Sequence, residues 1–468
     1  MTISRRSALQ GLATAGAAAA TTACATGAGS TKLPSAVSPP ANIPVLASDP
    51  LFNRPKAIDE MNAAGVDLIL CSDPVNVFYL TNHRIVPNML GMDGLAYASF
   101  SAGGAQKPAL LTGKFSYYLA SGQNSLPADV LLKLFTTPAE PELFETLTEA
   151  QDIVNATATG GYLTPEFDTA PYRTFETLRR KTIKDASANV AATSEAALLR
   201  ELLDNPLPNK RVAVDDARLI PRLAKSGLDI NFVDGERLLR RIRLQKSAAE
   251  VAYARHAASA NAEAGLTAAR SVGAGATFQE LQQEFAKECG ARLTKPVYIL
   301  IDGVVTPLAQ ERVERGRAFL IDCVSSFEGY HGDYGRTVCV GAPTKRMQQV
   351  IDALSFVWDR VLPELKVGTT YSDIWTLGQK LFSETKVDAG LIMGPHAVGL
   401  HHTDEPYARD FAAFEKDNLV LQENMVLSVD MPVLASGLGG TAHLEDLVLI
   451  GKDGPELLNP TSDRFIVV

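Results

Sequence analysis

The sequence has few cysteines and no excess of basic residues. Lysine and arginine together number 44, against 53 for aspartate and glutamate, which leaves a formal net charge of −9. A general nucleic-acid-binding surface needs a basic face to neutralise phosphates, so we expect no nucleic-acid partner. The five cysteines are far apart and form no C-x-x-C pair, which argues against a zinc ribbon or a dense disulfide framework. They are Cys24, Cys71, Cys289, Cys323 and Cys339.

Long apolar runs are also lacking. No segment after the first fifty residues has eighteen consecutive apolar residues, so we expect no membrane span in the body of the protein. Hydrophobic residues make up 46% and charged residues 21% of the 468 residues. These proportions are typical of a globular protein and exclude a disordered, collagenous or coiled-coil chain.

Residues 1–25 are typical of an export signal. Arg5 and Arg6 precede a mildly apolar Ala/Gly/Leu stretch that ends in small residues, the order of a basic region, an apolar region and a cleavage site. The paired arginines resemble a twin-arginine signal. A transmembrane anchor is the alternative, but the run is too short and too weakly apolar for a core of about 30 Å. We expect an exported protein, periplasmic or lipid-anchored to a bacterial membrane.

The end of this signal fits two alternative processing events. Cys24 is the candidate lipidated residue of a lipoprotein, although Thr21 stands where such signals usually carry leucine, and cleavage after Ala25 is the alternative. Residues 26–48 are rich in Ser, Pro, Ala and Gly, which predicts a flexible tether.

Residues 49–236 are expected to form an α/β domain. Strand patterns at 66–70, 108–111 and 212–214 alternate with helix patterns at 58–64, 140–147 and 187–203, which is typical of α/β structure. This part has no glycine-rich phosphate loop and no cluster of histidines or carboxylates. We therefore assign it mainly a scaffold role.

A second domain is expected over residues 237–468. A long amphipathic helix is predicted from Ser247, because Glu250 three residues later completes a capping box. The basic stretch at 237–243 just before it is interpreted as a solvated face between the domains rather than a binding patch.

The second domain contains an internal repeat. Residues 275–281 and 368–374 share the order Gly, small, Thr, aromatic, polar, acidic, aliphatic. In each copy a threonine, Thr277 or Thr370, stands at the expected N-cap of a helix. Capping boxes are common enough for chance to produce such an echo, but two helix pairs that each lead into strands indicate a duplicated half-domain.

Two acids occur in an apolar hairpin pattern at 319–337. Asp322 and Asp333 fall on its two predicted strands. Aspartate is depleted in strands and is costly to bury unpaired, so a shared cation is one interpretation. The other is that one aspartate is salt-bridged and the other lies in a turn.

Three later segments each place one metal-capable side chain beside strand-like residues. Asp430 ends the apolar run 425–429, and Glu445 precedes the run 447–450. Four carboxylates and one imidazole can hold two divalent ions if some carboxylates bridge them. These side chains are Asp322, Asp333, His396, Asp430 and Glu445, and the alternative for His396 alone is a histidine of the core.

This order of ligands resembles the pita-bread metallopeptidases: Xaa-Pro aminopeptidase, prolidase, methionine aminopeptidase and metal-free creatinase. Residues 54–67 and 76–82 look like the N-terminal domain of prolidase-type members, and 243–250 (RLQKSAAE) looks like the signature that opens their catalytic domain. The resemblance implies an α+β protein, in which a creatinase-like α/β N-terminal domain precedes a pita-bread catalytic domain with a pseudo-twofold duplication. It also implies a homodimer.

By the same resemblance, Asp322 serves one metal, His396 serves the other, and Asp333 and Glu445 bridge both. The acid at position 430 holds and deprotonates the attacking water, and a metal-bridging hydroxide is the nucleophile, because bound cations lower the pKa of water. The expected cofactors are two divalent ions, Mn, Zn or Co. The expected substrate is a small peptide with proline after the scissile bond.

The chain also departs from the family pattern. Asp430 replaces a glutamate, Thr403 and Val305 replace two histidines, and His443 replaces an arginine. Histidines near the ligands are candidates to replace the missing ones. His331 lies two residues from Asp333 and His443 two residues from Glu445, a spacing that places each histidine on the same face of an extended strand as the ligand. The alternative is that some are surface residues. The candidate catalytic residues are therefore Asp430, His402, His401, His331 and His443.

Taken together, the sequence predicts an exported metal-dependent hydrolase that cleaves an amide bond, most simply an Xaa-Pro dipeptidase or aminopeptidase. One alternative is a metal-free, creatinase-like hydrolase of a small C–N compound. The other is a non-catalytic binding protein that retains the fold, although an idle cluster of buried carboxylates would be destabilising.

Overall fold

The computed structural model describes residues 50–84, 94–104, 106–114, 116–117, 126–136, 190–406, 418–435, 437–459 and 463–468. The predicted export signal, the tether, Cys24 and the predicted helix at 140–147 lie outside these residues.

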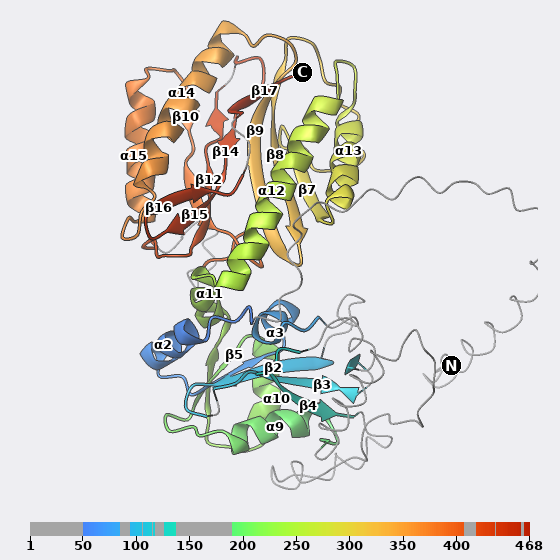
Figure 1. Cartoon of the computed structure of the whole chain (residues 1–468), viewed down its shortest axis with the longest axis vertical. Helices are drawn as coiled ribbons and strands as arrows, with labels where there is room; N and C mark the ends of the chain where they lie inside the picture. The colour runs from blue at the N-terminus through green and yellow to red at the C-terminus, as the bar shows by residue number, and fades with distance from the viewer. Residues whose placement is uncertain are drawn as a thin grey trace, which may run out of the picture. The chain divides into compact units, whose positions relative to one another are not determined.

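The N-terminal part is built on a mixed sheet (Figure 1). Its six described strands run in the order β4-β3-β2-β1-β5-β6, with β1 antiparallel to β2 and parallel to β5. The strands are β1 (Leu68–Cys71), β2 (Ala96–Ser101), β3 (Ala109–Gly113), β4 (Leu131–Phe135), β5 (Arg211–Val214) and β6 (Asn231–Asp234). The helices are α2 (Arg54–Ala64), α3 (Pro74–Thr81), α9 (Ser194–Asp204) and α10 (Ile220–Ala224), with a 3₁₀ turn at Ala217–Leu219.

These elements confirm the predicted α/β character. The first predicted helix ends as expected at Gly65, which has a φ of 62° and caps the helix in the left-handed conformation. Helix α9 begins later than predicted, because the Thr193 side chain accepts a hydrogen bond from the Ala196 N–H and so fixes the N-cap there. The domain boundary predicted between residues 236 and 237 falls at the start of α11 (Glu236–Leu244) and stays a prediction.

The interpretation of 237–243 as a solvated face is wrong for two of its arginines. In α11, Arg240 is 8% exposed and Arg243 is 0% exposed. Arg243 Nη2 lies 2.9 Å from the buried Asp404 Oδ1. The reason is that a carboxylate from a distant segment supplies the counter-charge, which no local sequence pattern reveals.

The first half of the C-terminal part packs two helices on a sheet. Helix α12 (Ala248–Ser271) begins with the predicted Ser247–Glu250 capping box, and α13 (Phe278–Ala291) follows it. Their apolar residues share a core with the sheet, whose order is β14-β9-β8-β7, with β17 parallel to β9 (Figure 1). The strands are β7 (Lys295–Ile301), β8 (Ala318–Phe327), β9 (Tyr330–Cys339), β14 (Leu444–Glu445) and β17 (Phe465–Val467).

The second half repeats this plan. Helices α14 (Lys345–Val361) and α15 (Tyr371–Glu384), joined through the 3₁₀ turn Leu362–Glu364, share a core with the sheet β11-β12-β15-β16. Its strands are β11 (Gly394–Ala397), β12 (Val426–Asp430), β15 (Leu447–Gly451) and β16 (Gly454–Leu457). Strands β10 (Gly390–Leu391) and β13 (Val433–Leu434) form a separate antiparallel pair.

The sequence repeat forms the same local structure twice. Thr277 caps α13 and Thr370 caps α15, each in a complete capping box. The preceding glycines, Gly275 and Gly368, have φ values of 98° and 95°, which favour glycine. Each glycine N–H also donates to a carbonyl far along the chain, at 2.7 Å and 2.9 Å. The predicted duplication is therefore present in the geometry of the two turns as well as in the amino-acid sequence.

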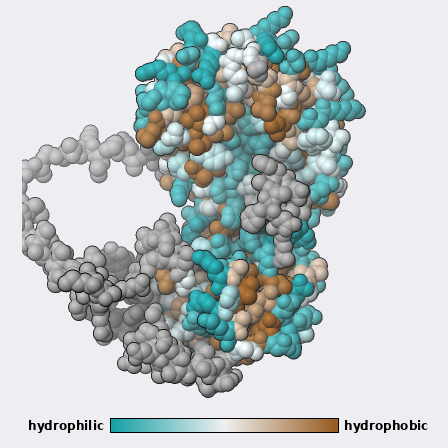
Figure 2. Space-filling view, turned by 180° about the vertical axis from the view of Figure 1, so that it is seen from behind, coloured by the Kyte–Doolittle hydropathy of each residue, from teal (hydrophilic) through white to brown (hydrophobic). Residues whose placement is uncertain are grey.

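No helix among the described residues is both long enough and apolar enough to cross a membrane. On the face drawn in Figure 2, hydrophobic residues occur in separate groups among hydrophilic ones.

Candidate metal centre and active site

The β8–β9 hairpin presents both predicted aspartates on one face. The antiparallel register pairs Asp322 with Gly335 and Val324 with Asp333, and directly paired residues project to the same side of a sheet. The opposite face of the hairpin rests on α12, where Asn261 Nδ2 donates to the Cys323 carbonyl at 2.6 Å.

The other predicted ligands come from the second half and from β14. In the β11–β12 pair, His396 lies opposite Ser428, and Asp430 lies opposite Gly394 at the strand end. Glu445 of β14 pairs with Gly335 of β9. Glu445 is thereby brought into one cross-strand row with Asp322.

The five predicted ligands lie together, and two further histidines join them. His396 Nε2 is 3.2 Å from Asp430 Oδ2 and 3.5 Å from Asp333 Oδ2. Three overlapping groups have potential ligand atoms that all lie within 4.8 Å of one another. These groups are Asp333–His396–His402, Asp322–His443–Glu445 and His396–Asp430–Glu445.

The cluster carries more negative charge than its own histidines neutralise. Burial, together with the neighbouring carboxylates, raises the pKa of Asp322 and of Glu445. Burial opposes ionisation of Asp333 too, but hydrogen bonds from His396 and His402 hold the pKa of Asp333 below its usual range. Burial lowers the pKa of His396, yet bonds to Asp333 and Asp430 outweigh it and raise that pKa to about 10.

Such an arrangement fits a divalent cation. Asp333 and Glu445 are 0% and 1% exposed, and the buried Asp322 Oδ1 has no hydrogen-bond partner among the described residues. Several carboxylates that share one buried space need a cation or protons to offset their repulsion. The residues that could hold it are those of the three groups above.

The four candidate histidines do not take equivalent positions. His402 Nε2 lies 3.0 Å from Asp333 Oδ2, and His443 Nε2 lies 3.1 Å from Glu445 Oε2. His331 Nδ1 instead lies 3.2 Å from the Gly399 carbonyl. Burial lowers the pKa of His401. Neither His331 nor His401 belongs to a candidate ligand group of the described residues.

Two positions where the sequence departs from the family pattern, Val305 and Thr403, contribute no imidazole to the cluster. Val305 lies on the loop after β7 and is 54% exposed, so it takes no part in the cluster. The Thr403 hydroxyl lies 3.3 Å from His402 Nδ1. The adjacent His402 therefore brings an imidazole into the cluster without one at position 403.

Tyr298 is a site residue that the sequence reasoning missed. Its hydroxyl lies 3.3 Å from His402 Nε2. Burial, followed by the charges of the cluster carboxylates, raises the pKa of Tyr298 well above its usual range, so the phenol stays neutral. A tyrosine within an apolar strand carries no signal of its own. Only its pairing with Val324, the neighbour of Asp333 across β8–β9, would have pointed to it.

The loop that carries His402 is anchored at its end by two buried acids. Asp404 accepts hydrogen bonds from Arg243 Nε at 3.0 Å and from the Leu400 N–H at 3.2 Å. Glu405 Oε2 accepts from the Tyr371 hydroxyl and the Ala397 N–H, both at 2.9 Å. These bonds fix the loop that holds His402 against the cluster.

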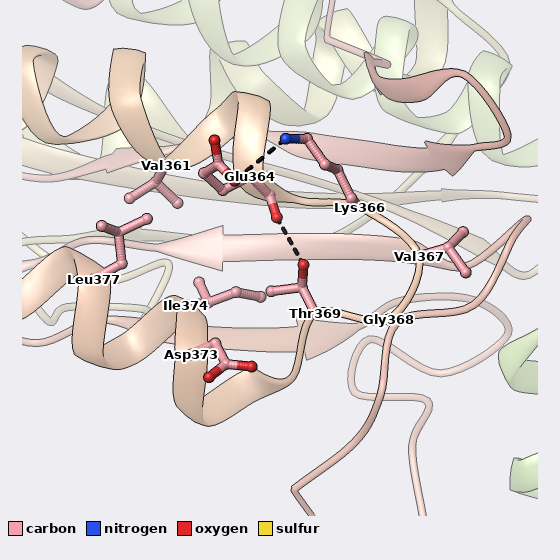
Figure 3. A pocket seen from close by; sticks show the side chains of 9 residues that line it. All are labelled: Val361, Glu364, Lys366, Val367, Gly368, Thr369, Asp373, Ile374 and Leu377. Carbon is pink, nitrogen blue, oxygen red and sulfur yellow. Dashed lines mark hydrogen bonds and ion pairs between the residues drawn. The ribbon is translucent and has the colours of Figure 1, made fainter.

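A separate hollow of about 700 Å³ lies between α14 and α15 (Figure 3). Its charged side chains interact with nearby residues: Lys366 Nζ contacts Glu364 at 3.2 Å, and Asp373 caps α15. None of the candidate ligands lines it. The cluster, and not this hollow, is the candidate active site.

The sequence signature of metallopeptidase family M24 matches residues 252–452, a range that contains every residue of the cluster. The chain therefore carries a domain of metallopeptidase family M24. The chain shares 26% identity over 159 residues with an Xaa-Pro dipeptidase of Pyrococcus furiosus, covering 34% of this chain and 44% of that protein. It shares 26% identity over 251 residues with a methionine aminopeptidase of Aquifex aeolicus, covering 45% and 95%. The chain thus spans less than half the length of the dipeptidase that it matches.

Solved structures show the same fold for most of the chain. The prolidase of Pyrococcus furiosus aligns with a TM-score of 0.59 at 17% identity, covering 87% of this chain and 100% of that one. Dipeptidase PepE of Mycobacterium ulcerans aligns with a TM-score of 0.60 at 16% identity, covering 89% and 96%. The predicted fold, an N-terminal domain followed by a pita-bread domain, is confirmed.

Proposed function

We propose that this protein is a metal-dependent peptidase that cleaves Xaa-Pro dipeptides or removes the residue before proline from short peptides. The observation that carries the proposal is the convergence of Asp322, Asp333, Asp430 and Glu445 with His396 inside an M24 domain. The substrate class is taken from the relatives, which are named Xaa-Pro dipeptidase.

In this proposal the cluster holds divalent cations. Asp322, Asp333, His396, Asp430 and Glu445 are the proposed ligands, and two ions match four carboxylates if some of these bridge. When bound, the ions would polarise the scissile amide and lower the pKa of the attacking water. Mn, Zn and Co all remain candidates on this donor set.

Asp430 is the proposed proton carrier. It ends β12, and its side chain is 29% exposed, whereas those of Asp333 and Glu445 are 1% exposed. It is thus the more accessible of these carboxylates. It accepts the proton of the attacking water on its carboxylate and passes it to the leaving proline nitrogen, a role that general acid–base groups fill within hydrogen-bond reach.

His402 is the proposed contact for the oxygen of the scissile amide. Its side chain is 31% exposed, so it borders both the buried acids and the solvent. The neutral Tyr298 hydroxyl, 3.3 Å from His402 Nε2, orients the ring and adds a second donor at the same place.

The test is hydrolysis of a panel of Xaa-Pro dipeptides by the purified protein, after chelation and after addition of Mn²⁺, Zn²⁺ or Co²⁺. We expect activity on Xaa-Pro that is lost with the chelator and restored by a metal, and much weaker activity on Ala-Ala. Activity that survives complete chelation would instead support a creatinase-like hydrolase. No turnover across the panel with metal bound would contradict the proposed substrate.

The proposal includes export and assembly. We propose that Arg5 and Arg6 direct the folded protein out of the cytoplasm. Replacing both by lysine should retain the protein inside the cell, and an unchanged distribution between cell fractions would contradict this. The homodimer stays a prediction, and light scattering of the purified protein tests it.

A further inference from the structure

His443 occupies space that any side chain at position 335 would take. A Cβ added to Gly335 would overlap the His443 ring and would lie 2.8 Å from Glu445 Oε2. Because Gly335 pairs with Asp322 on one side and Glu445 on the other, its missing side chain opens a gap in the row of acids. The imidazole of His443 fills this gap.

The backbone of His443 is held in place on both sides. Its N–H donates to Thr337 Oγ1 at 2.9 Å, and its carbonyl accepts from the same hydroxyl at 3.0 Å. The residue is 3% exposed. A buried imidazole with a fixed backbone is preorganised for one partner rather than mobile.

The direction of the ring identifies this partner. His443 Nε2 lies 3.1 Å from Glu445 Oε2 and 3.7 Å from Asp430 Oδ1, and it belongs to a group with Asp322 and Glu445 whose atoms lie within 4.8 Å. His396 belongs to the other two groups, one with Asp333 and His402 and one with Asp430 and Glu445. The two imidazoles thus serve different parts of the cluster.

We infer that His443 is a metal ligand on the Asp322 side of the cluster, so that each of the two cations has one imidazole nitrogen. This inference rests on the metal cluster of the proposed function, but not on its substrate. Imidazole donors suit zinc, cobalt and nickel, whereas all-oxygen sets suit manganese and magnesium. The Gly335–His443 pair therefore shifts the Asp322 side away from manganese and toward zinc or cobalt.

X-ray absorption at the zinc edge tests the inference, because imidazole rings scatter characteristically and can be counted. The full protein is stripped of metal and reloaded with zinc. His443→Gln should lower the count by about half an imidazole per zinc, since one of two ions loses its nitrogen. His256→Gln, on a histidine of α12 outside the candidate groups, is the matched control and should leave the count unchanged.

Gly335→Ala provides a second test that keeps His443 in the chain. The added Cβ takes the space of the ring, so the imidazole count should fall as in His443→Gln. Competition between Zn²⁺ and Mn²⁺ should move toward Mn²⁺ by at least about tenfold in both variants. Thermal unfolding of the metal-free variants checks that they fold.

An imidazole count in His443→Gln equal to that of the unmodified protein, or an unchanged preference between zinc and manganese, would overturn the inference. Xaa-Pro hydrolysis is measured on the same samples. A zinc-loaded protein that shows the expected loss of imidazole on mutation, yet cleaves no Xaa-Pro substrate, would support the inference while contradicting the proposed function.

Discussion

His402 Nε2 lies 3.0 Å from Asp333 Oδ2. His402 lies on a loop, directly before Thr403. The sequence left His401 and His402 as equal candidates to supply an imidazole at this point. His402 belongs to a candidate ligand group with Asp333 and His396, whereas His401 belongs to none of the candidate groups of the described residues. The cluster therefore contains one of the two rings.

The first prediction follows from this difference. His402→Ala should lower kcat/KM for an Xaa-Pro dipeptide by about 10²-fold or more, the contribution typical of a positioned acid–base or hydrogen-bonding group. His401→Ala should retain most of the activity. Steady-state kinetics of both variants at saturating metal provide the comparison. Equal losses in the two would show that the ring nearer Asp333 has no special role.

Tyr298 is expected to act through its hydroxyl. Tyr298→Phe removes the group 3.3 Å from His402 Nε2 and leaves the ring. We predict a fall in kcat of about 10-fold, with little change in the bound metal, because the lost donor contacts His402, the proposed substrate contact, and not one of the five proposed ligands. Metal analysis beside the kinetics separates these effects. If Tyr298→Phe releases metal, then the tyrosine supports the metal ligands instead.

The buried Arg243–Asp404 pair should matter for stability. Arg243→Met leaves the Asp404 carboxylate, which is 0% exposed, without its main counter-charge, and breaking a buried pair in this way costs about 3–5 kcal/mol. Arg218→Met is the control, because Arg218 pairs with Asp216 with its own side chain 79% exposed, and exposed pairs contribute about 0–1 kcal/mol. Urea unfolding measures both. A cost below about 1 kcal/mol for Arg243→Met would contradict this account.

His83 should make the protein sensitive to acid. Burial lowers the pKa of His83 from its usual 6.5 to about 4, and the residue is 4% exposed. Between these values the unfolded state binds a proton that the folded state does not, so stability falls as the pH drops from 6.5 to 4. The loss amounts to about 3 kcal/mol below pH 4.

The free energy of unfolding across this pH range tests the role of His83. His83→Gln removes the titrating group, so its stability should depend less steeply on pH between 6.5 and 4 than that of the unmodified protein. Parallel curves for the two proteins would show that another group causes the acid sensitivity.

Much of the site could be predicted from the sequence, because metal-capable side chains beside apolar strands are rare without a reason. Asp322 and Asp333 stood out for this cause, and the repeated Thr277 and Thr370 caps indicated the duplication. These signals are local, since each depends on residues within one strand or one turn.

The remaining features depend on contacts between distant segments. The burial of Arg243 requires Asp404, which lies 161 residues away. Gly335 gives no sign in the sequence that its missing side chain admits His443. Tyr298 contributes through cross-strand pairing, which the order of residues along one strand does not encode.

Whether the buried acids hold metal ions is tested by the metal content of the unmodified protein and of Asp333→Asn, measured by elemental analysis after loading with zinc and gel filtration. Asp333 is 0% exposed, and the amide keeps its shape while removing its charge. We predict about two zinc ions per chain in the unmodified protein and a clear loss in Asp333→Asn, with Asp388→Asn on the exposed surface as the unaffected control. Equal metal content in Asp333→Asn and the unmodified protein would contradict the account.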